Sequence, residues 1–396
     1  MGIHLLILLI CCYNQIMKIL LTGGGTGGHF YPLIAIAEKL IELSDQQKII
    51  DLKLYYMSDS IPDSEYNKRM LFDNKITFVQ VPAGKMRTYF SVSNFFDIFK
   101  TITGAFIGLI SMFFIYPDVV ISKGGYAAFP AVFGAKLLRI PVIVHESDSF
   151  PGRLNVWTAK FAWHVAISWP EAIEYLPKEK TILTGQPIRK EILHGNPTLA
   201  HEFFKLNSDL PVILVLGGSQ GAEIINDVIL EALPYLLSHY QIIHQTGKNN
   251  IDDVLSRSNL VMEKNPNIER YIAMPYLNNL ATRMAAGCAN IIISRAGSAI
   301  FEIASWGIPS IIIPITNSNG DHQRKNAYNY ARTGACEVIE EGNLSPHLLS
   351  SEIDKLLGSK EKLSQMKESA LTFATPTAAE KIAQSAIDLA QSHYEE

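Results

Sequence analysis

The sequence predicts an α/β protein with two Rossmann-like domains, each a parallel sheet covered by helices, facing each other across a cleft. Three observations support this. The chain of 396 residues exceeds what one hydrophobic core usually supports. An apolar strand, a glycine-rich loop and an amphipathic helix occur in this order twice, at "KILLTGGGTGGHFYPLIAIAEKLIEL" and at "LPVILVLGGSQGAEIINDVILEALPYL". Elsewhere apolar runs alternate with helical stretches, which is typical of parallel sheets.

Further strands are expected at short apolar runs in both halves of the chain. These runs are LKLYYMS, VVIS, PVIVHES, QIIHQTG, NIIISRAG and PSIIIPI.

We expect an N-terminal domain over residues 17–185, a linker over 186–200 and a C-terminal domain over 201–396, whose last helix could pack back on the first domain. The boundary falls in "LTGQPIRKEILHGNPTLA", where glycines, prolines and polar residues separate the halves. Ligands bind beyond the carboxyl ends of parallel strands, so both glycine loops should line the cleft.

The composition is that of a globular protein without a strong net charge. Apolar residues make up 48% and charged residues 18%, and the net charge of -4 gives no positive field for nucleic acid. The four cysteines lack zinc or disulfide spacing, which fits a reducing cytosol. Residues 1–16 make a poor signal peptide, because their apolar core is short and no basic residue precedes it. They are either a mis-assigned start before Met17 or a weak anchor.

The first glycine loop is suited to a phosphate or a sugar. Glycine lets a ligand approach backbone N–H groups, and the following helix directs the positive end of its dipole at that ligand. Gly23, Gly25 and Gly28 also match G-x-G-x-x-G, but the acidic residue that a dinucleotide site needs about 20 positions later is missing, since Asp59 comes too late. A tight turn without a ligand is the remaining alternative.

His29 stands at the start of the predicted helix that follows this loop. The helix dipole would keep its imidazole neutral and able to accept a proton. A capping or packing role is the alternative. Its place behind a glycine loop at a cleft favours catalysis.

Several motifs in a fixed order resemble one family. They are "LTGGGTGGHFYP", "ISKGGY", "HES", "GQPIR", "LGGSQGA", "SRAG" followed by "EIASWGIPSIIIP", and "DHQRKNA". From Met17 to the C-terminus the chain resembles the MurG family. The resemblance implies a GT-B fold and inverting transfer of N-acetylglucosamine (GlcNAc) from UDP-GlcNAc to the C4 hydroxyl of N-acetylmuramic acid (MurNAc). The acceptor would be lipid I, a polyprenyl-diphosphate-linked precursor at the cytoplasmic face of the cell membrane. Another sugar or lipid acceptor, or a nucleotide-sugar-binding subunit without catalysis, are the alternatives.

The resemblance places the donor mainly in the second half. Arg189 matches a diphosphate-binding arginine, whose planar fork suits paired phosphate oxygens, and a solvent-facing arginine is the alternative. Glu302 matches a glutamate that accepts both ribose hydroxyls, with Arg295 as an alternative buried partner. The other matches are Ser219 and Gln220 for the donor at a helix N-terminus, Leu277 for uracil through backbone groups or else for the core, and Gln323 for the GlcNAc hydroxyls.

The acceptor residues are implied in the first half, where backbone amides would hold the diphosphate or the sugars. They are Thr26, Gly27, Gly28, Gly124, Gly125 and Tyr126. His29 is the candidate general base, and Glu146 is a rival. Asp148, assigned to donor binding, stands where the family usually has an asparagine, and a carboxylate cannot donate a hydrogen bond unless protonated. The stretch from Arg295 to Glu302 is also one residue shorter than in the commonest versions, so both features could signal an altered donor preference.

No D-x-D pair occurs in the sequence, so neither a cofactor nor a metal is expected.

The uncharged residues 102–116 are too few for a helix that spans the roughly 30 Å hydrocarbon core. They are expected as a buried helix of the N-terminal domain or as part of a patch on anionic lipid, which would make the protein peripheral. That patch would also include Phe90, Phe95, Phe96, Lys85, Arg87 and Lys100.

Overall fold

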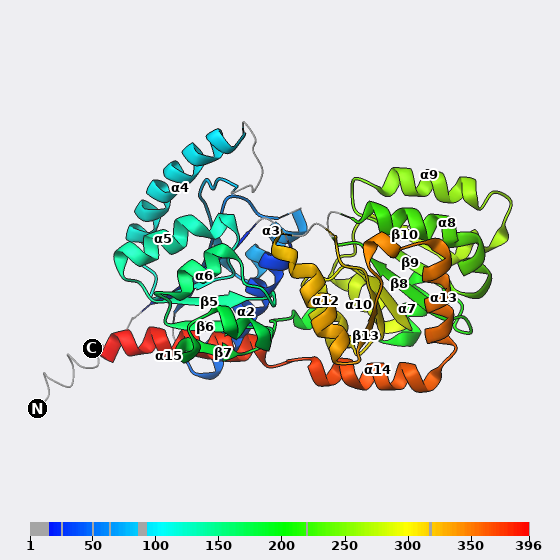
Figure 1. Ribbon diagram of the computed structural model, residues 1–396. Coiled ribbons are helices and arrows are strands. Elements are labelled where there is room, and N and C mark those ends of the chain that lie inside the picture. Colours follow the sequence, from blue (N-terminus) through cyan, green and yellow to red (C-terminus); the bar gives the residue numbers. More distant parts are fainter. Residues whose placement is uncertain are drawn as a thin grey trace, which may run out of the picture. The chain divides into compact units, whose positions relative to one another are not determined.

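The computed structural model describes residues 16–24, 27–49, 51–62, 65–85, 93–218, 221–316 and 319–395, which form two compact units. The first unit contains the described residues up to Ile188 together with those from Thr375 onward, and the second is Arg189–Ala374. The chain therefore leaves the first unit inside the expected linker and returns to it for its last helix (Figure 1).

The first unit contains a seven-stranded sheet in which every paired strand is parallel. The order is β3-β2-β1-β4-β5-β6-β7. The strands are β1 (Met17–Thr22), β2 (Leu52–Ser58), β3 (Ile76–Gln80), β4 (Val119–Ser122), β5 (Val142–Glu146), β6 (His164–Ile167) and β7 (Thr181–Leu183). The strand order reverses between the adjacent strands β1 and β4, where Thr22 pairs with Ser122. At such a switch point the loops after the two strands form a ligand site.

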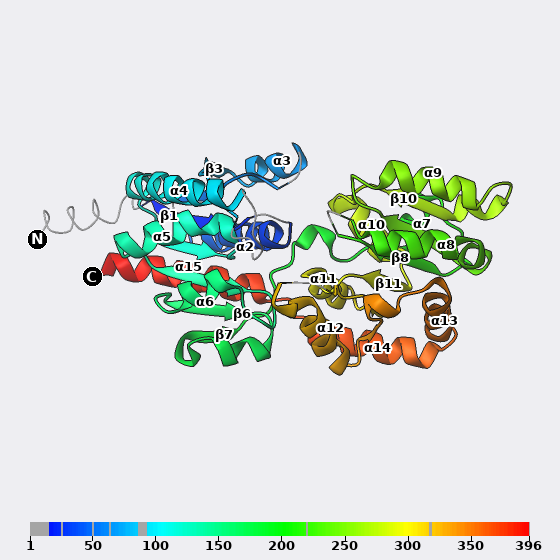
Figure 2. The same cartoon turned by 45° about the horizontal axis from the view of Figure 1, so that its top comes forward.

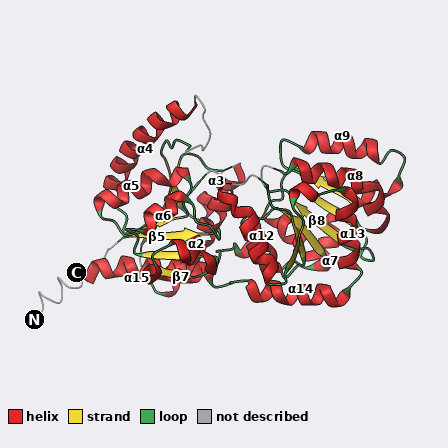
Figure 3. Ribbon diagram, viewed as in Figure 1, coloured by secondary structure: helices red, strands yellow, loops and turns green. Residues whose placement is uncertain are grey.

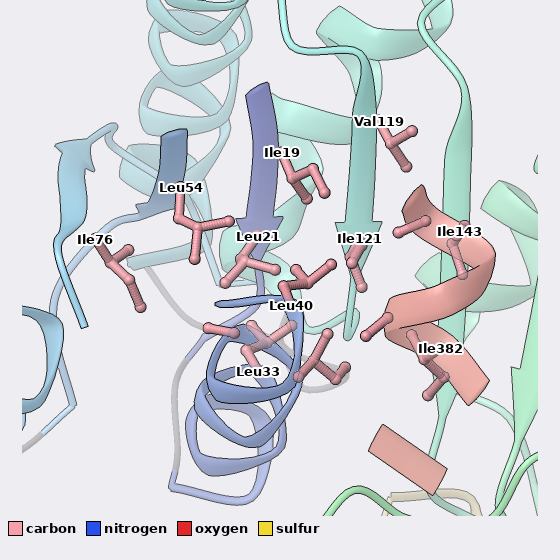
Figure 4. Packing of buried hydrophobic residues seen from close by; sticks show 14 of the residues in the cluster. Ile19, Leu21, Leu33, Leu40, Leu54, Ile76, Val119, Ile121, Ile143 and Ile382 are labelled. Carbon is pink, nitrogen blue, oxygen red and sulfur yellow. The ribbon is translucent and has the colours of Figure 1, made fainter. Parts of the chain in front are cut away.

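Helices cover this sheet and close its core. They are α2 (Gly27–Gln46), α3 (Glu65–Asp73), α4 (Ser93–Ile115), α5 (Phe129–Leu138), α6 (Arg153–Ala159) and α15 (Ala378–Glu395). Leu33 and Leu40 of α2 pack against Ile19 and Leu21 of β1, and Ile382 of α15 joins the same buried cluster (Figure 4). The last helix is thus part of the first unit's core, where it packs against α2.

The second unit contains a six-stranded sheet that is also parallel throughout, in the order β10-β9-β8-β11-β12-β13. The strands are β8 (Val212–Leu216), β9 (Gln241–Gln245), β10 (Tyr271–Met274), β11 (Ile291–Ser294), β12 (Ser310–Ile312) and β13 (Cys336–Val338). The helices are α7 (Pro197–Phe204), α8 (Glu223–His239), α9 (Ile251–Val261), α10 (Asn279–Cys288), α11 (Ala299–Trp306), α12 (His322–Arg332), α13 (Pro346–Leu357) and α14 (Lys360–Phe373). Figure 3 shows both sheets in yellow with their helices in red, and the predicted α/β class with two parallel sheets is confirmed.

Helix α4 differs from its prediction in length and in burial. It begins at Ser93, and its window Phe95–Ile115 is long and apolar enough by length and composition to cross a membrane, with only 17% of the window buried. The expectations of a short helix and of a buried helix are therefore both wrong. Helix α4 packs along α5 (Figure 2), and many of its apolar side chains are left exposed, among them Phe99, Phe106 and Phe114.

Candidate active site

The described start of the first glycine loop, directly after β1, leaves no room for a side chain at Gly24. A Cβ on Gly24 would lie 2.5 Å from Oγ of Ser58 and 2.6 Å from Cβ of Ala127. Glycine is therefore required where the loop packs against neighbouring segments. Gly27 and His29 both belong to the first turn of α2, and His29 is half-buried.

The loop after β4 reaches His29. Gly124 and Gly125 have φ values of +78° and +77°, which favour glycine. A Cβ on Gly125 would lie 2.8 Å from the carbonyl oxygen of Gly24 and 3.4 Å from Nε2 of His29. The two predicted acceptor loops thus meet beside the imidazole. Gly28 lies next to His29 in α2, whereas Thr26 lies outside the described residues.

Tyr126 is held by a carboxylate that sequence reasoning did not assign to the site. Its hydroxyl donates a 2.9 Å hydrogen bond to Oδ2 of Asp59, which follows β2, and Nζ of Lys85 lies 5.7 Å from the centre of its ring. Burial and this hydrogen bond raise the pKa of Tyr126. The phenol therefore stays protonated, and Asp59 positions it.

Glu146 organises the loop that follows β5. Its Oε1 accepts a hydrogen bond of 2.9 Å from the amide of Asp148, and its Oε2 accepts bonds of 2.9 Å from the amide of Gly152 and 2.8 Å from Nδ2 of Asn155. Burial and the nearby charge of Asp148 raise the pKa of Glu146, while Lys123 lowers it. Both carboxylate oxygens are thus engaged in holding the loop. Asp148 lies in the first unit, with the predicted acceptor residues.

In the second unit, Arg189 and Glu302 lie beside each other. Arg189 is 5% exposed, its Nη1 donates to Oδ1 of Asn279, and its Nη2 lies 3.5 Å from Oε1 of Glu302. The Asn279 amide donates in turn to Glu191. Burial raises the pKa of Glu302, and Arg189 opposes that shift. The alternative of a solvent-facing arginine is therefore wrong, because Arg189 is buried in a hydrogen-bonded cluster.

Arg295 has a different partner from the one suggested by the sequence. Its Nη2 lies 2.6 Å from Oε1 of Glu341, and its Nη1 donates to the carbonyl of Ile313 at 3.2 Å. Oε2 of Glu341 accepts the amide of Thr316 at 3.1 Å. The suggested pairing of Arg295 with Glu302 is wrong, because the guanidinium of Arg295 forms an ion pair with Glu341, and Glu302 lies beside Arg189.

The remaining donor candidates are anchored to the second unit's backbone. Oε1 of Gln323, in the first turn of α12, accepts the amide of Ile315 at 3.2 Å. Leu277 is 3% exposed, and its carbonyl accepts a 3.1 Å hydrogen bond from Oγ1 of Thr282. Ser219 and Gln220 lie outside the described residues.

No group of three or more histidine, cysteine, aspartate or glutamate side chains that could hold a metal ion occurs within the described ranges. Sequence reasoning missed Asp59, Asn279 and Glu341. Each lies outside the recognised motifs or pairs with a residue distant along the chain, so no local pattern marks it.

Family models match both halves of the chain. The glycosyltransferase family 28 N-terminal domain matches residues 19–167, and the glycosyltransferase family 28 C-terminal domain matches residues 212–384. The N-terminal match includes His29 and the glycine loops beside it. The C-terminal match includes Glu302 and Asn279, which is a hydrogen-bond partner of Arg189.

Two curated relatives carry the same name, UDP-N-acetylglucosamine–N-acetylmuramyl-(pentapeptide) pyrophosphoryl-undecaprenol N-acetylglucosamine transferase. The Clostridium novyi protein is 35% identical over 87% of this chain and 92% of its own length. The Thermodesulfovibrio yellowstonii protein is 35% identical over 95% of this chain and 98% of its own length.

Solved structures share the fold. MurG from Acinetobacter baumannii matches with a TM-score of 0.67 at 24% identity, over 94% of this chain and 99% of its own. A UDP-GlcNAc 2-epimerase from Neisseria meningitidis, bound to UDP-GlcNAc, matches with a TM-score of 0.65 at 15% identity, over 94% of this chain and 100% of its own. The resemblance that the motifs indicated is confirmed by the curated relatives. The chain is a glycosyltransferase that belongs to glycosyltransferase family 28, within the MurG family.

Proposed function

We propose that the protein transfers GlcNAc from UDP-GlcNAc to the C4 hydroxyl of MurNAc in a pentapeptide-bearing, undecaprenyl-diphosphate-linked acceptor, lipid I. The observation that carries this proposal is the alignment of nearly the whole chain with relatives named for that reaction. The geometry of each unit is consistent with it, because each unit supplies one half of the chemistry.

The first unit supplies the group that activates the acceptor. The hydroxyl oxygen attacks C1 of GlcNAc, its proton passes to the imidazole of His29, and the bond from C1 to the phosphate oxygen breaks. Configuration at C1 inverts in this single displacement. His29 suits the role because it lies beside Gly125, where the loops after β1 and β4 meet. Glu146 is the weaker candidate because its two carboxylate oxygens accept three hydrogen bonds within the protein.

The second unit supplies the donor site. Arg189 offers a guanidinium to the diphosphate as negative charge develops on UDP, and fixed positive charge there lowers the barrier. Glu302 is close enough to Arg189 for one nucleotide to meet both side chains, the carboxylate at the ribose and the guanidinium at the phosphates. Gln323 would contact the GlcNAc hydroxyls, and Leu277 the uracil.

A transfer assay with defined acceptors tests the proposal. Purified protein is incubated with UDP-GlcNAc labelled in the sugar and with a lipid I analogue, a diacylglycerol or no acceptor. We expect label in the lipid phase only with the lipid I analogue. Transfer to diacylglycerol would replace the acceptor assignment, and UDP-GlcNAc binding without transfer would indicate a binding subunit.

Transfer is expected to need no metal ion. The basis is that the sequence has no D-x-D pair and that the described residues contain no cluster of metal ligands. Rates measured with excess EDTA should therefore equal rates measured with magnesium. Loss of activity in EDTA that magnesium restores would contradict the expectation.

We also propose that α4 rests on the cytoplasmic face of the membrane. Its exposed side chains include Phe106, Phe113 and Phe114, which are 65%, 61% and 78% exposed. The opposite face packs closely, since a Cβ on Gly108 would lie 2.7 Å from Cβ of Pro130. A helix fixed to α5 along one side is suited to lying in the interface, and Lys100 adds positive charge for anionic lipid. Phe90 and Arg87 of the expected patch lie outside the described residues.

Charged substitutions on α4 should release the protein from lipid. In a Phe106→Asp/Phe113→Asp variant, each lost phenylalanine removes roughly 1.5–3 kcal/mol of burial, so partition onto phosphatidylglycerol vesicles should fall more than tenfold. The matched control is Phe72→Asp on α3, where the phenylalanine is 80% exposed. Cosedimentation measures the partition. Equal binding of the α4 variant and wild type would contradict the proposal.

A further inference from the structure

Lys123 is a fully buried ammonium that the reaction described above does not use. The side chain is 1% exposed, and its Nζ has no hydrogen-bond partner in the described residues. It lies directly after β4, with its Cβ 3.0 Å from where a Cβ on Gly23 would be. Burying a charge without compensation is strongly unfavourable, so the surroundings must balance it.

Two carboxylates supply that balance. Glu146 and Asp148 both act electrostatically on Lys123, and each favours its charged form. The neighbouring His145 is also buried, and burial together with Lys123 lowers its pKa, so it stays neutral. Burial lowers the pKa of Lys123 to about 8, and the carboxylates resist that shift. Lys123 is therefore an ammonium below about pH 8, next to the carboxyl groups of Glu146 and Asp148.

The loop that begins at Lys123 connects this cluster to the imidazole. A Cβ on Gly124 would lie 2.4 Å from Oδ1 of Asn155, whose Nδ2 donates to Glu146. The next residue, Gly125, lies beside His29, because a Cβ added to it would be 3.4 Å from Nε2 of the imidazole. Residues 123, 124 and 125 thus lie next to the first glycine loop, the hydrogen-bond network of Glu146 and the candidate base, respectively.

We propose that Lys123 is a positioning residue for the acceptor reaction: it balances the charges of Glu146 and Asp148 and thereby holds the loop at residues 123–125 against His29. The inference rests on the proposed function, because one of its two measurements is the rate of GlcNAc transfer. It also gives a physical reason for an aspartate at position 148. Beside a buried ammonium a carboxylate there is favourable, whereas without the ammonium it would only repel Glu146.

A double-substitution cycle tests the pairing, using Lys123→Met, Asp148→Asn and the two combined. Methionine keeps the length of the lysine stem and removes its charge. In the wild-type background D148N removes a partner of the ammonium, so it should lower both transfer and the unfolding temperature. In the K123M background, D148N removes only the repulsion between Asp148 and Glu146, so it should raise both the transfer rate and the unfolding temperature. The double variant should exceed, by at least tenfold, the activity predicted by multiplying the effects of the single variants.

A pH profile separates positioning from general loss of structure. Lys123 lowers the pKa of Glu146, so without it the carboxylate protonates at higher pH. The part of the acid limb of kcat/KM that reports Glu146, in addition to the part set by the base His29, should therefore move to higher pH in K123M. It should move back in the double variant, where Asp148 no longer raises the pKa of Glu146. His145, being neutral, does not contribute to this limb. The control is Lys178→Met, an exposed lysine of the first unit, which should leave the profile unchanged.

Each outcome decides the inference. Effects of D148N that have the same sign and size in both backgrounds would overturn it, as would a K123M variant with wild-type activity and pH profile. If K123M does not fold, the double variant should fold, and its failure would also contradict the pairing. If the wild-type protein shows no transfer, the proposed function fails, while the unfolding temperatures still test the charge pairing.

Discussion

Replacing His29 by alanine is expected to lower kcat by roughly a hundred- to ten-thousandfold, the usual contribution of a positioned general base. Donor affinity should not change, because His29 lies in the first unit whereas Arg189 and Glu302 lie in the second. Turnover should be reduced and not abolished, since stabilisation of the leaving diphosphate remains. Steady-state rates with the lipid I analogue and calorimetry with UDP measure the two quantities.

The matched control for this variant is His164→Ala. His164 begins β6 in the same unit and hydrogen-bonds to Oγ of Ser385 at 2.7 Å, outside the predicted site. Its loss should affect stability and leave turnover within a few-fold of wild type. An H29A protein with unchanged kcat would exclude His29 as the base and return attention to Glu146.

Replacing Glu302 by alanine is expected to weaken UDP binding by roughly a hundredfold to ten-thousandfold. The variant loses two hydrogen bonds from ribose hydroxyls to a carboxylate, and bonds to a charged group contribute about 1.5–3 kcal/mol each. It also leaves Arg189 without the carboxylate that lies 3.5 Å away. Titration calorimetry gives the dissociation constant. Glu202→Ala on α7, which removes an exposed carboxylate of the same unit, should bind UDP as the wild type does.

The same residue predicts how donor affinity depends on pH. Burial raises the pKa of Glu302 above its ordinary value, with Arg189 opposing. Only the ionised carboxylate accepts both ribose hydroxyls, so UDP affinity should fall as pH decreases through this raised pKa and remain constant above it. The dependence should be absent in Glu302→Ala. An unaltered dissociation constant in that variant would remove the ribose assignment.

The strands that the sequence predicted are those in the sheet interiors. Every apolar run proposed as a strand is one, because strands covered on both faces are apolar throughout. The missed strands are β3, β7, β10 and β13, which are the edges of the two sheets, and the short β6. Edge strands are partly solvated and contain polar residues, as Ile76–Gln80 does, so their pattern does not stand out.

Helix α4 shows a second limit of sequence reasoning. An uncharged stretch is equally compatible with burial and with a lipid-facing surface, because both remove apolar side chains from water. The deciding fact is tertiary: one face of α4, which includes Gly104, Gly108 and the fully buried Met112, packs against the rest of the unit, while most of the phenylalanines remain exposed. The uncharged stretch 102–116 also ends before Lys100, whereas helix α4 includes Lys100 and begins at Ser93.

Only those site residues that belong to a recognised sequence motif could be predicted from the sequence. His29, Arg189 and Glu302 stand in recognised patterns, and the structure places Arg189 beside Glu302. Contacts between distant parts of the chain, such as Arg295 with Glu341 or Tyr126 with Asp59, depend on how strands and helices are brought together. They leave no spacing in the sequence by which they could be found.

Nuclear magnetic resonance of the lipid-linked product tests the central claim most directly. Transfer by a single displacement with a general base predicts a β linkage from C1 of GlcNAc to the C4 oxygen of MurNAc, formed by the wild type and at a strongly reduced rate by H29A. An α linkage, attachment at another hydroxyl, or free 2-epimerised sugar with no lipid product would contradict the account.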